Sequence, residues 1–60
     1  MRYRSGEVPA IGDRVMDKDG RRAIVIGLKG SLIVIKWDEG VIDFEYSSEQ
    51  FSLVQRGDQA

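Results

Sequence analysis

The chain has 60 residues and a formal net charge of −1, and it contains neither cysteine nor histidine. A single domain of this size has a small core, so nearly every large apolar residue is expected to contribute to it. The missing cysteines exclude disulfides and thiolate metal sites, and the missing histidines remove the most common general base and metal ligand. With no paired nucleophile and base, we predict that the protein is not an enzyme and binds no metal or other cofactor.

Charge is distributed unevenly along the chain. Residues 1–36 carry eight basic and four acidic side chains, a balance of +4. Residues 37–60 carry one basic and six acidic side chains, a balance of −5. This division is typical either of an ordinary solvated surface or of a polarised surface that contacts a partner, including a second copy of the chain. It differs from the uniform positive charge of many nucleic-acid binders.

The sequence shows no apolar run long enough to span a membrane, and no apolar stretch follows the basic residues near its start. We therefore expect a cytoplasmic protein without membrane contacts. Composition divides the chain into a flexible lead-in (residues 1–10), one domain (11–55) and a polar tail (56–60). Within the lead-in, Tyr3 and Val8 are the candidates for an anchor.

Apolar alternation predicts five short strands and no long helix. The strands are expected at residues 11–17, 22–28, 32–37, 41–46 and 51–54. Asp- and Gly-containing turns separate them, and residues 47–50 are expected to form a single helical turn. These elements predict an all-β fold, a small five-stranded barrel with one helical turn before the last strand.

The expected core follows from the side chains that alternate onto one face of each strand. In the second strand, the bulky Ile24 and Ile26 are placed inside, opposite the small Ala23 and Val25. In the fourth strand, Phe44 is placed inside. The complete expected core is Val15, Ile24, Ile26, Ile33, Ile35, Trp37, Ile42, Phe44, Phe51 and either Leu53 or Val54.

Carboxylates are concentrated around the predicted third turn and fourth strand. Five lie within twelve residues: Asp38, Glu39, Asp43, Glu45 and Glu49. One interpretation is an acidic surface for a basic protein partner, with Tyr46 as an exposed aromatic at the strand end. The alternative is a solvated face that resists edge pairing. The residues assigned to protein contact are Asp38, Glu39, Asp43, Glu45 and Tyr46.

A second hypothesis concerns the basic side chains of the first two strands and the turn between them. Contacts to phosphate groups by these side chains would bind RNA or DNA without sequence preference. The residues assigned to this contact are Arg14, Lys18, Arg21 and Arg22. Three aspartates are interleaved with them, and their charge weakens the field that nucleic acid would meet.

Three segments and one aromatic residue resemble the small bacterial SH3-like barrels of the KOW/Tudor-like group. They are Gly12-Asp13-Arg14-Val15, Ala23-Ile24-Val25-Ile26-Gly27, Ile35-Lys36-Trp37-Asp38-Glu39-Gly40 and Phe51. The Trp-Asp-x-Gly hairpin is the most specific of these features. The resemblance spans about residues 11–55 and implies an SH3-like barrel with a one-turn helix before the last strand.

This resemblance implies little about activity, because the same fold hosts many unrelated functions. We expect a non-catalytic binding module that acts through protein–protein contacts, either with an unidentified partner or by weak self-association. The alternative is a nucleic-acid-binding module of KOW-like type. The resemblance to Tudor-like domains also implies a possible aromatic cage, in which Trp37, Phe44 and Tyr46 would bind a cation. The strand pattern instead favours core packing for Trp37 and Phe44.

Overall fold

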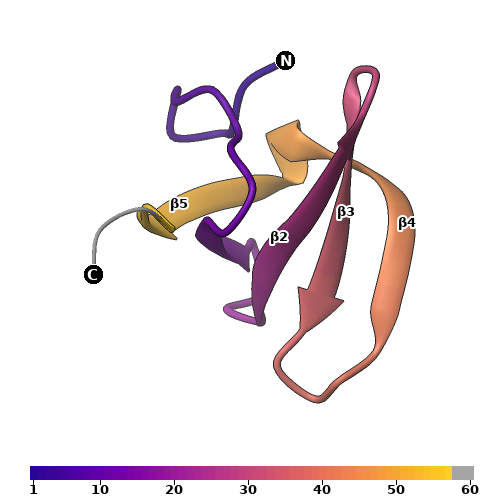
Figure 1. Ribbon diagram of the computed structural model, residues 1–60. Helices are drawn as coiled ribbons and strands as arrows, with labels where there is room; N and C mark the ends of the chain where they lie inside the picture. Colours follow the sequence, from indigo (N-terminus) through magenta and orange to yellow (C-terminus); the bar gives the residue numbers. More distant parts are fainter. Residues whose placement is uncertain (58–60) are drawn as a thin grey trace.

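The computed structural model describes residues 1–57, apart from the side chain of Glu45 (Figure 1). Its elements are β1 (Arg14–Asp17), β2 (Arg22–Lys29), β3 (Leu32–Trp37), β4 (Ile42–Ser47), the 3-10 helix η1 (Ser48–Gln50) and β5 (Phe51–Gln55). The predicted all-β class and the helical turn before the last strand are confirmed. In the part of the chain that is described, no helix is long and apolar enough to cross a membrane.

The strands form one antiparallel sheet in the order β4-β3-β2-β1-β5. Since β4 and β5 are its two edges, the sheet is open, and the predicted closed barrel is wrong. Closure would require hydrogen bonds between β4 and β5. The described strands show no such pairing. Where β4 ends and β5 begins, the Tyr46 and Phe51 rings pack with their centroids 5.5 Å apart. The lead-in covers the start of β5, where the Arg4 amide donates to the Phe51 carbonyl at 2.7 Å.

Two register shifts decide which side chains point inward. In β2 the pairing with β3 shifts between Val25 and Gly27, so Ile26 is an extra residue. In β4, Asp43 pairs with Ile35 and Tyr46 with Ile33, so two residues stand opposite Val34. A bulge of this kind breaks the alternation of the strand. As a result, Asp43 and Tyr46 both lie on the inner face although they are three residues apart.

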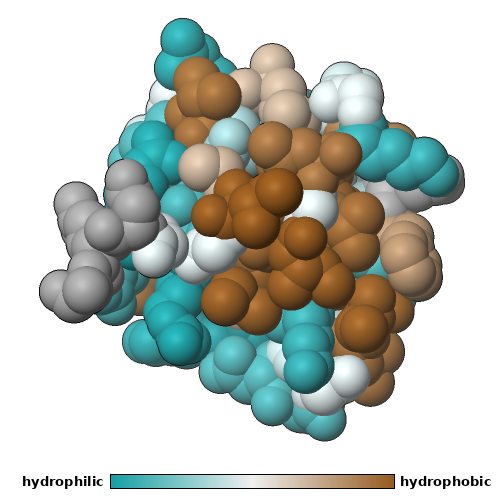
Figure 2. All heavy atoms as spheres, in the orientation of Figure 1, coloured by the Kyte–Doolittle hydropathy of each residue, from teal (hydrophilic) through white to brown (hydrophobic). Residues whose placement is uncertain are grey.

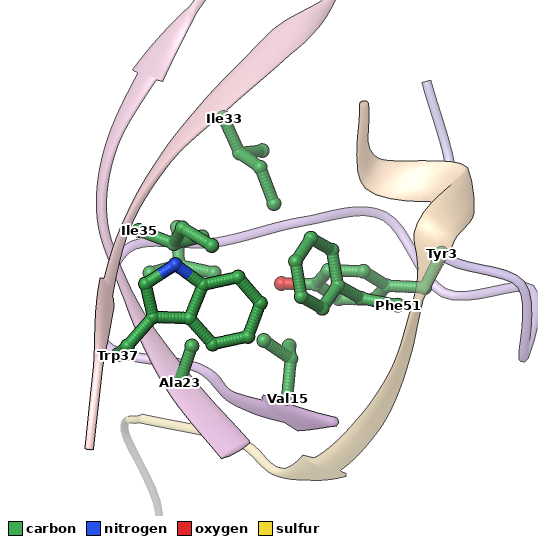
Figure 3. Close-up of a cluster of buried hydrophobic side chains, with 8 residues drawn as sticks. Tyr3, Val15, Ala23, Ile33, Ile35, Trp37 and Phe51 are labelled. Carbon is green, nitrogen blue, oxygen red and sulfur yellow. The ribbon is translucent and has the colours of Figure 1, made fainter. Parts of the chain in front are cut away.

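The core lies between the inner face of the curled sheet and the lead-in (Figure 3). Its buried apolar residues are Tyr3, Val15, Ala23, Val25, Ile33, Ile35, Trp37 and Phe51. Figure 3 shows the rings of Tyr3, Trp37 and Phe51 gathered between the strands, with the Trp37 and Phe51 centroids 5.8 Å apart. The predictions for Val15, Ile33, Ile35, Trp37 and Phe51 are confirmed, and Leu53 packs against this core while partly buried.

The remaining core predictions are wrong. Ile24 is only half-buried, and the side chains of Ile26, Ile42 and Phe44 are exposed. Of the alternatives Leu53 and Val54, Leu53 packs against the core and Val54 is exposed. In β2, the small Ala23 and Val25 face inward instead, because they stand opposite the buried Trp37 and Ile35 of β3. In β4, the bulge brings Asp43 and Tyr46 inward and leaves Ile42 and Phe44 on the outer face.

Asp13 is fully buried and connects the lead-in to the residues that follow β5. Its carboxylate accepts hydrogen bonds from the Tyr3 hydroxyl (2.6 Å) and from the backbone amides of Ala10 (2.9 Å) and Gly57 (3.2 Å). The Arg56 guanidinium completes the set at 2.9 Å. We call these five residues the Asp13 network. They tie the lead-in, expected to be flexible, to the domain through the buried Tyr3 and the Ala10 amide. Arg56 also donates to the Val8 carbonyl at 2.8 Å, although the Val8 side chain is half-exposed.

The network shifts two pKa values in opposite directions. Burial acts to raise the pKa of Asp13, but its hydrogen bonds and the charge of Arg56 have the larger combined effect and leave that pKa below its usual value. The pKa of Tyr3 is raised, first by burial and then by its hydrogen bond to the Asp13 carboxylate and the negative charge there. The folded state therefore favours an ionised Asp13 beside a neutral Tyr3.

Candidate functional site

The outer face of β2, β3 and β4 carries apolar side chains that the described residues leave uncovered. Phe44 is 69% exposed, Ile42 46% and Ile26 41%, and the neighbouring Ile24 and Val34 are half-buried. We call these five residues the outer patch. Figure 2 shows hydrophobic side chains gathered over the region of these strands. Isolated exposed apolar residues are ordinary, but a contiguous group is a feature of contact surfaces.

Cross-strand pairing creates the outer patch. Ile24 stands opposite Lys36, and Lys36 stands opposite Ile42. In the next row of outward-facing residues, Gly27 stands opposite Val34. A Cβ at Gly27 would lie 3.4 Å from the Val34 side chain, so the missing side chain leaves that flank of Val34 uncovered. The patch therefore extends continuously over three strands.

Three cations lie on the same face. Arg14 stands opposite Ile24, Arg22 stands opposite Met16, and Lys36 lies between Ile24 and Ile42. All three side chains are exposed, and among the described side chains of residues 1–57, which do not include that of Glu45, no ion pair to them is found. We call Arg14, Arg22 and Lys36 the basic flank. Their free charges stay available to a partner.

The four residues predicted to contact nucleic acid are divided between two surfaces. Arg14 and Arg22 belong to the basic flank. Lys18 and Arg21 instead line an open cavity of about 560 Å³ beside the β1–β2 turn, together with Asp17 and Glu49. The Asp17 carboxylate is already engaged, because it accepts the backbone amides of Asp19 (2.9 Å) and Arg21 (2.8 Å). Interleaved charges of both signs give this cavity no evident preference for a ligand.

Arg21 covers the one tryptophan of the chain. Its guanidinium lies 4.2 Å from the Trp37 ring centroid and forms an ion pair with Glu39. The hydrogen bond to Glu39 raises the pKa of Arg21 above its usual value. At the edge of the ring, the indole N–H donates to Asp43 Oδ2 at 2.6 Å, and Tyr46 packs edge-on with a centroid distance of 5.9 Å.

The residues predicted to form an acidic contact surface do not share one face. Asp38 is exposed in the β3–β4 turn, and Glu39 is exposed but paired with Arg21. Asp43 is turned inward to Trp37, and Tyr46 packs half-buried against the core. The side chain of Glu45 lies outside the described residues. The expectation that Asp43 lies outward with Asp38 is therefore wrong, and the cause is the bulge in β4.

Among the described residues, no group of three or more acidic side chains is placed to hold a metal ion. Buried side-chain polar atoms in this part of the chain all have hydrogen-bond partners. The inner polar groups are thus satisfied by the fold, so a ligand would have to meet exposed groups, among them those of the outer face.

No protein-family model, curated protein or solved structure matches this chain. The candidate site therefore depends on geometry. Sequence reasoning missed Ile42 and Phe44 as surface residues. For the bulge in β4 the sequence carries no comparable signal, but for Ile26 in β2 it does: Gly27 inside an apolar strand is a common mark of a bulge.

Proposed function

We propose that the protein is a non-catalytic binding module that acts through protein–protein contacts, with the outer patch and the basic flank as its contact surface. The observation that carries this proposal is the exposure of Phe44, 69% on the outer face. Aromatic and arginine side chains dominate the binding energy of many protein interfaces. Cytoplasmic location remains an expectation within this proposal.

The finer fold assignment also belongs to the proposal. We infer that the open sheet is a variant of the small bacterial SH3-like barrels of the KOW/Tudor-like group. The β1–β4 meander, the return of β5 to β1 and the single 3-10 turn between β4 and β5 support this assignment. Because such folds host many functions, the assignment adds little to the choice of partner.

The acidic contact surface has less geometric support than the outer patch. Of its residues, Asp38 and Glu39 are exposed, and Glu39 already has a partner. Weak self-association through opposite charges remains one form of the proposal. Analytical ultracentrifugation at low and high salt tests this form, since a monomer under both conditions contradicts it.

A pair of surface substitutions tests the protein-contact function. We compare the wild type with a double variant, Ile42→Ser with Phe44→Ser, and with Val8→Ser as a control. All three positions are exposed, so each protein should keep its fold. We expect immobilised wild type and the Val8→Ser control to retain the same protein from a soluble cell extract, and the double variant to lose it. Equal retention by all three, or none by the wild type, overturns the proposal.

Nucleic-acid binding is the second candidate, and the observation that favours it is the position of Phe44 on the same face as Lys36. An exposed ring beside cations is the arrangement on which single-stranded bases stack. The test is a titration with a generic oligonucleotide at low salt, followed by backbone amide shifts. If amides near Phe44 and Lys36, and those near Arg14, Lys18, Arg21 and Arg22, do not shift, nucleic acid is excluded.

A further inference from the structure

Neither edge of the sheet offers a regular template for an added strand. At β5 the lead-in covers the edge: the Arg4 amide donates to the Phe51 carbonyl at 2.7 Å, and the Leu53 amide donates to Ser5 Oγ at 2.9 Å. At β4 the bulge opposite Val34 interrupts the strand. Covering elements and bulges are devices that prevent edge pairing. A partner must therefore meet the face of the sheet, not its edge.

The dimensions of the outer patch suit a helix. Neighbouring strands lie about 4.8 Å apart, so three strands present a surface about 10 Å across. An α-helix with its side chains has a diameter of about 10–12 Å. Helix on sheet is also one of the few stable ways to cover an apolar sheet face. A single amphipathic helix would cover Ile26, Ile42 and Phe44 together.

Charge then restricts which helix fits. Lys36 lies between Ile24 and Ile42, so a helix over the patch would surround its ammonium group. Burial of a charge without a counter-ion is costly, and no ion pair to Lys36 is found in the described part of the chain. A second copy packed face to face would bring a second Lys36 toward the first, which opposes that occupant.

We propose that the outer patch binds an amphipathic helix of another protein whose polar flanks carry Asp and Glu. The apolar side chains of this helix pack on Ile26, Ile42 and Phe44, and its carboxylates pair with the basic flank. The inference depends on the proposed protein-contact function and goes further by specifying the secondary structure and charge of the partner.

Three synthetic peptides test it. All carry Leu at i, i+3, i+4 and i+7, and their remaining positions are rich in Glu, Gln or Lys. Each is titrated into ¹⁵N-labelled protein at low salt. We expect the Glu peptide to bind most tightly and the Lys peptide least, with shifts confined to amides of β2, β3 and β4 and to those near Arg14 in β1. Added salt should reduce the difference between them, because it screens charge pairs.

A charge reversal provides the matched control. Lys36→Glu should weaken binding of the Glu peptide by about tenfold or more, because like charges placed together at an interface are strongly unfavourable. Lys18→Glu makes the same change of charge beside the cavity, away from the outer patch, and should leave this affinity within about twofold. Equal effects of the two substitutions would show that only net charge matters and would overturn the inference.

The other outcomes distinguish a failure of this inference from a failure of the proposed protein-contact function. Equal affinity for all three peptides, or tightest binding of the Lys peptide, overturns the acidic helix but leaves a protein-contact surface. If no peptide binds while the wild type self-associates through Phe44, a second copy is the occupant and the inference fails alone. The inference and the protein-contact function both fail if three results coincide: no peptide binds, the wild type does not self-associate, and no protein is retained in a way that depends on Phe44. An oligonucleotide that shifts these amides while the peptides do not supports nucleic acid instead and overturns both.

Discussion

The two faces of the β2–β3–β4 sheet are both apolar, but only one is covered. On the inner face, Val25, Ile33 and Ile35 have no exposed surface. On the outer face, Ile42 and Phe44 keep about half or more of theirs. Full burial of such a side chain contributes about 1.5–3 kcal/mol. The inner face obtains this stabilisation on folding, whereas the outer face obtains most of it only when a partner covers it.

Polar groups differ between the two faces in the same way. On the inner side, the Asp13 carboxylate has four partners, and the Trp37 indole N–H has Asp43. On the outer side, the basic flank of Arg14, Arg22 and Lys36 has no ion pair among the described side chains of residues 1–57. Hydrophobicity therefore does not separate the core of this domain from its contact surface; the presence of covering and pairing groups does.

Removal of the Asp13 carboxylate should have the largest effect on stability. Asp13→Ala leaves the Tyr3 hydroxyl and two backbone amides without their acceptor and removes the charge that pairs with Arg56. Loss of one partner of a buried charged pair costs about 3–5 kcal/mol. Small domains have little more stability than this in total, so we expect the variant to be largely unfolded by circular dichroism. Asp19→Ala, in the exposed β1–β2 turn, is the control and should unfold at the urea concentration of the wild type.

Two phenylalanine truncations compare the faces directly. Phe51→Ala removes a fully buried ring and should cost about 3–5 kcal/mol. Phe44→Ala removes an exposed ring and should change the free energy of unfolding by no more than about 0.5 kcal/mol. Urea denaturation of both variants measures the difference. Similar losses for the two would mean that the outer face contributes to the core as the alternation alone predicted.

The hydrogen bond from the Trp37 indole to Asp43 should have an intermediate effect on stability. Asp43→Leu leaves the buried indole N–H without an acceptor, at a cost of about 1–3 kcal/mol. Asp43→Asn keeps an acceptor oxygen in the same place and should retain most of the stability. Thermal unfolding midpoints of the two variants give the comparison, and equal midpoints would show that the bond itself contributes little.

Acidic pH and alkaline pH should each weaken the Asp13 network. The folded pKa of Asp13 is depressed, so its contribution is present above the unfolded value of about 3.9 and is lost as the pH falls below it. The folded pKa of Tyr3 is raised, so its contribution is present below about 10 and is lost as the pH rises. Each unit of either shift corresponds to about 1.4 kcal/mol. We expect the free energy of unfolding, measured by urea denaturation, to be constant near neutral pH. Tyr3→Phe should remove much of its decrease at alkaline pH. A Tyr3→Phe variant that still shows the full decrease would contradict the role of Tyr3 in the pH dependence.

The exposed ion pair should have the smallest effect. Glu39→Gln removes the charge that faces Arg21 but leaves an amide able to accept its hydrogen bond. Exposed pairs of this kind contribute little to stability. The thermal midpoint should not change measurably at moderate salt, and a large decrease would indicate that Arg21 must be fixed over Trp37 for the hairpin to fold.

Local sequence patterns predict the strands of this protein well, because alternation and turn residues act over a few positions. The third strand lies at 32–37 as expected, and the second, fourth and fifth differ from expectation by one residue at one or both ends. The first strand begins at Arg14, three residues later than expected. The direction of the side chains is harder to predict. Extra residues near Ile26 and Phe44 break the alternation, and such bulges depend on pairing with another strand.

The Asp13 network and the outer patch escape prediction for a related reason. An aspartate next to an arginine is ordinarily a surface residue, and nothing near Asp13 in sequence indicates that Tyr3 and Arg56 converge on it. The bulky apolar side chains of Ile42 and Phe44 likewise look like core residues. Long-range contacts decide both cases, and the places where local rules fail are often functional.

The position of Trp37 has a practical consequence for experiments. It is the single tryptophan of the chain, it is buried on the inner face of β3, and it donates a hydrogen bond to Asp43. Its intrinsic fluorescence will therefore change when the domain unfolds. A partner that docks on the opposite face meets Lys36 and Phe44 and leaves the indole in place. Emission from this residue can thus verify that a variant is folded while a separate label reports binding, so the two properties can be measured independently in one sample.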